Sequence, residues 1–169
     1  MKLACIDNHI LSWAILGQTK DVDPNLVARA KLFIRLLEKR KVRIVVPAVV
    51  VGEILVCVEL ARHDVFRQVL ATRFVVEPYD AAAAACAAKI RQLNKNIVAW
   101  CKDQNKTYTH AKIAADHQIA GIAISKKVDV LYTQDNGLMM FAKPHIATEH
   151  MPQDIGEQLS LLEEAAKHS

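Results

Sequence analysis

The sequence predicts an α/β fold, a three-layer α/β/α sandwich around a central parallel sheet of four to five strands. Short apolar runs, typical of strands buried on both faces, alternate with longer segments of helical periodicity. Parallel neighbours need crossover connections, and helices supply them. The chain has 169 residues and no repeat or low-complexity linker. We therefore expect one domain that spans residues 1–169.

Each expected strand is a short run bounded by polar or turn-forming residues. We expect strands at residues 3–6, 42–46, 74–76, 128–132 and 145–147. Apolar residues at helical spacing predict helices at residues 8–16, 25–39, 49–60, 81–93 and 112–126, and one that begins at Asp154. Asp80 and Thr109 stand where the N-cap residues of two of these helices belong.

Composition limits the class of protein. With 52% hydrophobic and 24% charged residues, the chain is expected to be ordered nearly throughout. The longest apolar run, residues 42–60, is broken by charges, and the N-terminal apolar stretch is too short for a signal peptide. The cysteines, at positions 5, 57, 86 and 101, lack zinc-site spacing and are expected to be buried and reduced. We expect a cytoplasmic protein without a membrane span, and its net charge of +4 is compatible with a nucleic-acid partner without requiring one.

Two acids follow expected strands. Asp7 ends the first strand and Asp135 comes shortly after the fourth. Ligands of open α/β sheets bind at the carboxyl ends of the strands, so both acids are expected at that edge of the sheet.

Two further acids interrupt apolar stripes of expected helices. Asp116 has Ile113 and Ile119 three positions before and after it. Glu53 is surrounded at helical spacing by five apolar residues, which predicts that its carboxylate faces the buried side: Val49, Val50, Val56, Cys57 and Leu60. We expect no Lys or Arg beside either acid on its stripe.

A buried, unpaired carboxylate costs several kcal/mol, so each acid needs a cation, a set of donors or a proton. If the acids converge, they repel one another, and a hard divalent cation such as Mg²⁺ or Mn²⁺ favours their all-oxygen surroundings. For any single acid taken alone, a helix cap, a turn or a partly exposed flank is a better explanation than a metal ligand. Four acids at the appropriate places in the topology favour the metal.

These residues resemble the PIN-domain family, and within it the VapC-like toxins. The resemblance extends over about residues 3–150 and rests on four short motifs. They are the segments 6–11 (IDNHIL), 47–55 (PAVVVGEIL), 115–123 (ADHQIAGIA) and 130–135 (VLYTQD). His9 departs from the Asn or Ser more usual at its position, and Gln118 from an aliphatic residue.

The resemblance implies a metal-dependent endoribonuclease, the toxin of a type II toxin–antitoxin pair. Its implied catalytic residues and Mg²⁺ or Mn²⁺ ligands are the four acids Asp7, Glu53, Asp116 and Asp135, supported by Asn8, His9 and Thr133. Thr133 would hydrogen-bond an acid or a metal-bound water, unless it only ends a strand. The implied partners are RNA, a cognate antitoxin and a second copy of the chain. Basic residues that border the expected cleft are candidates for RNA contact: Lys95, Lys102, Lys106 and Lys112.

Two alternatives stay open from the sequence. One is a catalytically silent PIN-like domain that binds RNA or a protein partner. The other is a phosphoryl-transfer enzyme with a nucleophilic Asp after the first strand, although Asp7-Asn8-His9 lacks the second Asp usual in such sites.

Overall fold

The computed structural model describes residues 2–17, 24–96, 99 and 109–167. The strands are β1 (Leu3–Ile6), β2 (Arg43–Pro47), β3 (Val75–Glu77), β4 (Val130–Tyr132) and β5 (Thr148–Glu149). The α-helices are α1 (Asn8–Ile15), α2 (Pro24–Lys39), α3 (Ala48–Val56), α4 (His63–Arg73), α5 (Ala81–Leu93), α7 (His110–Ser125), α8 (Asn136–Ala142) and α9 (Ile155–Lys167), and a short 3-10 helix, η1 (Leu60–Arg62), precedes α4.

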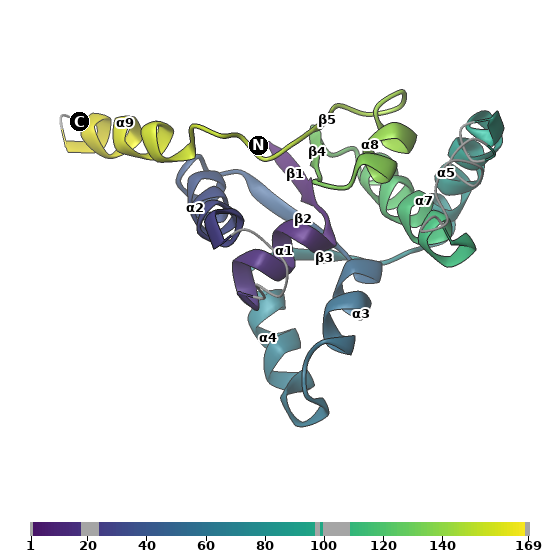
Figure 1. The fold of residues 1–169 in the computed structure, drawn as a ribbon, viewed down its shortest axis with the longest axis horizontal. Coiled ribbons are helices and arrows are strands. Elements are labelled where there is room, and N and C mark those ends of the chain that lie inside the picture. The colour runs from purple at the N-terminus through teal and green to yellow at the C-terminus, as the bar shows by residue number, and fades with distance from the viewer. Residues whose placement is uncertain (1, 18–23, 97–98, 100–108, 168–169) are drawn as a thin grey trace.

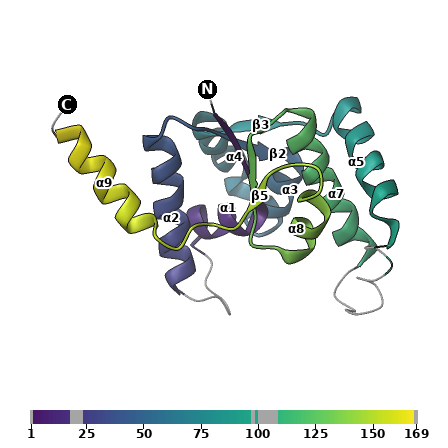
Figure 2. The same cartoon turned by 90° about the horizontal axis from the view of Figure 1, so that it is seen from above.

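The strands form one sheet of five in the order β3-β2-β1-β4-β5, and every pair is parallel. Helices α1 and α2 lie on one side of this sheet, and α5, α7 and α8 lie on the other (Figure 1). Figure 2 shows α9 extending outward beyond α2. The predicted three-layer α/β/α class and the parallel sheet are confirmed.

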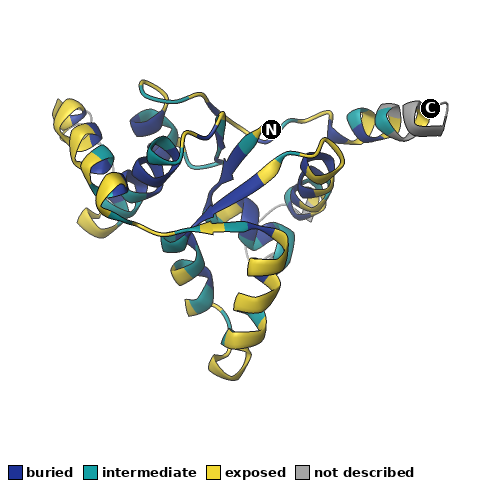
Figure 3. Ribbon diagram, turned by 180° about the vertical axis from the view of Figure 1, so that it is seen from behind, coloured by how far each residue is buried: buried dark blue, intermediate teal, exposed yellow. Residues whose placement is uncertain are grey.

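The core is built around the central strand. Ala4, Cys5 and Ile6 are fully buried, as the uninterrupted apolar run predicts for a strand covered on both faces. Figure 3 shows buried residues along the strands and exposed residues on the outer faces of the helices. Burial also raises the pKa of the Cys5 thiol, which keeps it protonated.

Helices α5 and α7 pack unusually close together. A Cβ atom placed on Gly121 of α7 would lie 2.6 Å from the carbonyl oxygen of Ala83 and 2.9 Å from the Cβ of Ala87. Small residues on both helices therefore permit this contact. It fixes α7, the helix that carries Asp116.

Several predicted boundaries are wrong. The helix after β2 ends at Val56, and two unpredicted helices, α4 and α8, follow Arg62 and Asp135. The fifth strand is at Thr148–Glu149, three residues later than predicted, where Thr148 pairs with Leu131.

The predicted burial of the stripe that carries Glu53 is also wrong. Val56 and Leu60 are 87% and 82% exposed, and Cys57 is exposed as well, contrary to the expectation of a buried thiol. Within the predicted stripe Val50 is buried as expected, and it forms the buried face of α3 together with Ile54. No helix in the described ranges is long and apolar enough to cross a membrane.

Candidate functional site

The central strands bring two of the predicted site residues together. In the parallel register of β1 and β4, Ile6 pairs with Tyr132, and the Asp7 amide donates to the Tyr132 carbonyl (3.2 Å). Asp7 and Thr133, the next residue on each strand, therefore lie side by side at the carboxyl edge of the sheet.

Both acids at this edge also begin a helix. Asp7 caps α1, and its Oδ1 accepts from the Ile10 amide (3.1 Å). Asp135 caps α8, and its Oδ1 accepts from the amides of Gly137 (2.7 Å) and Leu138 (3.2 Å). These bonds use one oxygen of each carboxylate, which leaves Asp7 Oδ2 and Asp135 Oδ2 for other partners.

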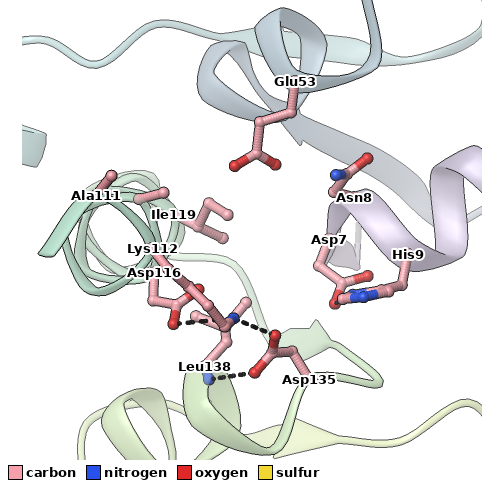
Figure 4. A pocket seen from close by; sticks show the side chains of 11 residues that line it. Asp7, Asn8, His9, Glu53, Ala111, Lys112, Asp116, Ile119, Asp135 and Leu138 are labelled. Carbon is pink, nitrogen blue, oxygen red and sulfur yellow. Dashed lines mark hydrogen bonds and ion pairs between the residues drawn. The ribbon is translucent and has the colours of Figure 1, made fainter. Parts of the chain in front are cut away.

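Helices α3 and α7 supply the remaining two acids. Asp116 is buried, with 5% of its surface exposed, whereas Glu53 is partly exposed. A pocket of about 440 Å³ is lined by all four predicted acids together with Asn8, His9 and Lys112. Figure 4 shows the four carboxylates around this space, with Glu53 opposite Asp135. The structure thus brings the four predicted acids to one pocket.

Thr133 links two of these acids. Its hydroxyl donates to Asp7 Oδ2 and accepts from the Asp135 amide (2.9 Å). The His150 Nδ1 atom lies 2.8 Å from the Thr133 carbonyl oxygen and holds the same turn. Thr133 is fully buried, so it orients the carboxylate of Asp7, which is one of the two roles considered for it. No sequence pattern points to His150, because its link to Thr133 exists only after β5 has paired.

Asn8 and His9 flank the pocket. The Ser12 hydroxyl donates to Asn8 Oδ1 (2.8 Å) and thereby orients the amide. Burial raises the pKa of Glu53, and the hydrogen bond with Asn8 opposes part of that rise. His9 Nδ1 lies 3.5 Å from Asp7 Oδ2, and the hydrogen bond with Asp7 raises the pKa of His9. The His9 side chain is 49% exposed, so it lines the mouth of the pocket rather than the core.

Lys112 contradicts the prediction that no cation accompanies the buried acids. It precedes Asp116 by one helical turn, and its Nζ atom lies 3.5 Å from Asp116 Oδ2 and forms a short ion pair with Asp135 Oδ2. The stripe is defined by apolar neighbours, and a lysine four positions before Asp116 reaches it through its long side chain. Lys112 thus belongs to the acid pocket itself.

Burial and Lys112 act in opposite directions on the acids. Burial raises the pKa of Asp116 to about 7, although the charge of Lys112 opposes the shift. Burial also raises the pKa of Glu53. At Asp135, burial favours the neutral acid, but the Lys112 hydrogen bond and charge and the two backbone donors together lower its pKa.

The donor set fits a hard divalent cation in its chemistry. Four carboxylates offer oxygen ligands only, which suits Mg²⁺ or Mn²⁺. Asp116 Oδ2 is buried and lacks a hydrogen-bond partner among the described residues. Within those same residues, no three Asp, Glu, His or Cys side chains yet form a group that could hold a metal ion. A cation would therefore have to draw the carboxylates closer to one another.

Among the other predicted RNA-contact lysines, Lys95 lies in the part of the chain that the structure describes, and it does not line this pocket. Lys95 is exposed and borders a separate hollow on α5, with Ala88, Arg91 and Gln92. Lys102 and Lys106 lie outside the described residues, as do Trp100 and Cys101. Of the two predicted lysines that the structure describes, Lys112 lines the pocket with the acids and Lys95 does not.

Comparisons of the sequence find no matching family model and no matching curated protein. Comparisons of the structure find VapBC proteins. VapBC2 from Rickettsia felis, solved bound to a DNA fragment from its promoter, matches with a TM-score of 0.60 and 14% identity over 89% of this chain and 99% of that chain. DNA-bound VapBC from Salmonella typhimurium matches with a TM-score of 0.53 and 19% identity over 90% and 100%.

VapBC-1 from nontypeable Haemophilus influenzae matches with a TM-score of 0.61 and 13% identity over 88% of this chain and 98% of that chain. At such identities the likeness shows the fold, and it extends over nearly the whole of each matched chain. The sequence motifs and the structural likeness agree on the same group of proteins. The chain therefore has the PIN-like α/β/α fold that its four motifs predicted.

Proposed function

We propose that this protein is a metal-dependent endoribonuclease that hydrolyses phosphodiester bonds of RNA. One observation carries the proposal: four acids, remote in sequence and borne by different elements, line one pocket at the carboxyl edge of the sheet. Helix capping accounts for one oxygen each of Asp7 and Asp135, but Asp116 is buried where folding alone favours a neutral residue. Four carboxylates around one pocket are therefore better explained by a cation and a reaction than by stability.

Asp7, Glu53, Asp116 and Asp135 are the proposed ligands of Mg²⁺ or Mn²⁺. A divalent cation held there lowers the pKa of a bound water and neutralises charge on the phosphate. The chain's own contribution is to hold the ligands. Thr133 fixes Asp7, backbone amides fix Asp135, and Asn8 stands beside Glu53. RNA is proposed as the substrate from the resemblance to VapC-like proteins.

A role as the toxin of a type II toxin–antitoxin pair is proposed for the same reason, since the structural neighbours are VapBC proteins. Exposed aliphatic side chains on α3, η1 and α4 support a protein partner: Val56, Leu60 and Val65 are 87%, 82% and 63% exposed. Such side chains gathered on one projection of the molecule are typical of an interaction surface. Figure 3 shows this projection as largely exposed. A homodimer stays a prediction.

The test is cleavage of a structured RNA in Mn²⁺, in Mg²⁺ and in chelator. Wild type is expected to cut only with metal, and Asp7→Asn and Asp116→Asn are expected to lose cleavage by at least about 100-fold, because an amide keeps the shape but binds metal weakly. Asp64→Asn is the matched control, since Asp64 lies exposed on α4 outside the pocket. Cleavage that persists in chelator or in both site variants would refute the proposal.

A catalytically silent domain that binds RNA is the second candidate, favoured by one observation. Lys112 already neutralises part of the acid cluster, and no metal-ready group stands among the described residues. This candidate predicts that RNA binds to the wild type and to Asp7→Asn equally, without cleavage in any metal. The same assay, with a measurement of RNA affinity added, separates the two functions.

A further inference from the structure

The Lys112 side chain crosses the acid pocket. Lys112 stands in the first turns of α7, where Thr109 caps the helix and accepts from the Lys112 amide (3.1 Å). From there its ammonium extends to a position between Asp116 and Asp135, as Figure 4 shows. The lysine therefore links a carboxylate of its own helix to the carboxylate that caps α8.

This ion pair differs from an ordinary helical pair on a surface. Lys112 and Asp116 have the usual spacing of four residues, but the side chain of Asp116 is only 7% exposed and that of Asp135 only 14%. Exposed pairs contribute little, whereas removal of one partner from a buried group leaves an uncompensated charge. The Lys112 ammonium thus compensates the negative charge of two largely buried carboxylates that lie close together.

The influence of Lys112 reaches three of the four acids. Its positive charge acts to lower the pKa of Glu53, of Asp116 and of Asp135. A divalent cation bound by the same carboxylates would act in the same direction and would need the same oxygen atoms. Asp116 Oδ2 and Asp135 Oδ2, the atoms nearest the ammonium, are also those without a backbone donor. The Lys112 ammonium and a divalent cation would therefore compete for the same carboxylate oxygens.

We propose that Lys112 is a positioning residue that occupies the place of the divalent cation in the metal-free protein, so that the metal binds in competition with the ammonium. The inference rests on the proposed metal site, and it identifies Lys112 as a residue that lowers the affinity of that site for the divalent cation. In the metal-free protein Lys112 holds Asp116 and Asp135 near each other. When a cation binds, the ammonium must leave at least one of these carboxylates.

The test is calorimetric titration of the metal-free protein with Mg²⁺, at about pH 8.5 so that protonation of Asp116 competes little. Lys112→Met removes the competing charge and keeps the length of the side chain. It is expected to bind Mg²⁺ about tenfold more tightly than wild type, because one charge-assisted hydrogen bond no longer has to be broken. Lys112→Arg keeps the charge and is expected to stay within about threefold of wild type.

Lys126→Met is the matched control. Lys126 follows the same helix, and its Nζ atom pairs with Glu77 and Asp80, outside the acid pocket. Its loss is expected to leave Mg²⁺ affinity unchanged. Thermal melting in chelator is the second measurement. There Lys112→Met is expected to melt below wild type and to gain more from Mg²⁺, a metal-dependent difference that a purely structural lysine would not give.

The outcomes separate the inference from the proposed function. Mg²⁺ that binds wild type and Lys112→Met equally, or binds the variant more weakly, overturns the competition and leaves the metal site intact. Mg²⁺ that binds neither protein overturns the metal site and the competition together. Binding to Lys112→Met alone supports the competition in its strongest form.

Discussion

At the residue scale, burial acts against ionisation of Asp116. Its pKa is raised, mainly by burial, from 3.8 to about 7 in the folded protein. The folded state therefore binds this proton more tightly than the unfolded chain. The resulting stabilisation is fully present below the ordinary pKa, and it is lost as the pH rises toward 7.

Asp116→Asn is accordingly expected to be more stable than wild type in chelator above pH 7, by about 2 kcal/mol, because the amide cannot ionise. Its free energy of unfolding should also change less than that of wild type between about pH 4 and pH 7. Urea denaturation across this range, with Asp64→Asn as the control, measures both effects. Parallel pH profiles for wild type and Asp116→Asn would contradict the assignment.

Thr133 gives a second prediction at this scale. Thr133→Val removes the hydroxyl that donates to Asp7 and accepts from the Asp135 amide, at a position that is fully buried. The variant is expected to lose about 1–3 kcal/mol of stability, because two buried groups lose a partner. Mg²⁺ binding should weaken as well, since Asp7 is no longer oriented. Thr133→Ser keeps the hydroxyl and is expected to preserve Mg²⁺ affinity in the same titration.

The four acids could be predicted from the sequence for different reasons. The stripe that predicts Asp116 is buried, whereas most of the stripe that predicts Glu53 is exposed. The sequence predicts Lys112 only as an RNA contact, because spacing alone does not show that Asp135 of another element lies within its reach. Contacts between elements that are distant in sequence, such as this ion pair, cannot be predicted from local sequence patterns.

At the scale of elements, the contact of α5 with α7 decides where Asp116 stands. Gly121→Ala would place a methyl group 2.6 Å from the Ala83 carbonyl oxygen, and backbone cannot move aside cheaply. We expect a loss of about 1–3 kcal/mol in stability. Gly156→Ala on α9 is the control, because nothing lies within 4 Å of the added atom. It should stabilise by about 0.5–1 kcal/mol, and denaturation of both variants checks the contrast.

Long helices with a capping residue were predicted, and two shorter helices, α4 and α8, were not. Helices α5 and α7 begin after Asp80 and Thr109, as their capping positions predicted. Helix α4 carries a short apolar stripe, Val65, Phe66, Val69 and Leu70, but Leu70 alone among its residues is buried. The stripe could therefore have indicated a helix in the sequence, although most of it does not face the core. Helix α8 has seven residues, and an apolar run of that length does not distinguish a strand from a helix.

At the scale of the whole molecule, the parallel sheet explains why acids remote in sequence meet. β1 and β4 are neighbours at the centre, so Asp7 and Asp135 follow adjacent strand ends, and α3 and α7 bring Glu53 and Asp116 to the same pocket. The alternation of strands and helices was sufficient to predict this edge. It could not predict how close the carboxylates stand, because that depends on side-chain packing and on Lys112.

The stability of the whole fold should therefore depend on divalent metal. A ligand that binds only the folded state stabilises it by about 2.7 kcal/mol at one hundred times its dissociation constant. For a domain of this size that corresponds to a rise of about 5–10 °C in melting temperature. Thermal melting of wild type in chelator and in saturating Mg²⁺ or Mn²⁺ is the measurement.

Two variants decide whether such a rise comes from the acid pocket. Asp7→Asn removes one proposed ligand and should lose most of the rise, while Asp64→Asn, altered at an exposed acid outside the pocket, should keep it. A nonspecific effect of divalent ions on surface charge would act on both variants alike. If wild type has the same melting temperature in chelator and in saturating metal, the pocket does not bind a divalent cation that stabilises the fold. In that case Lys112 and protonation alone would compensate the negative charge of the four acids.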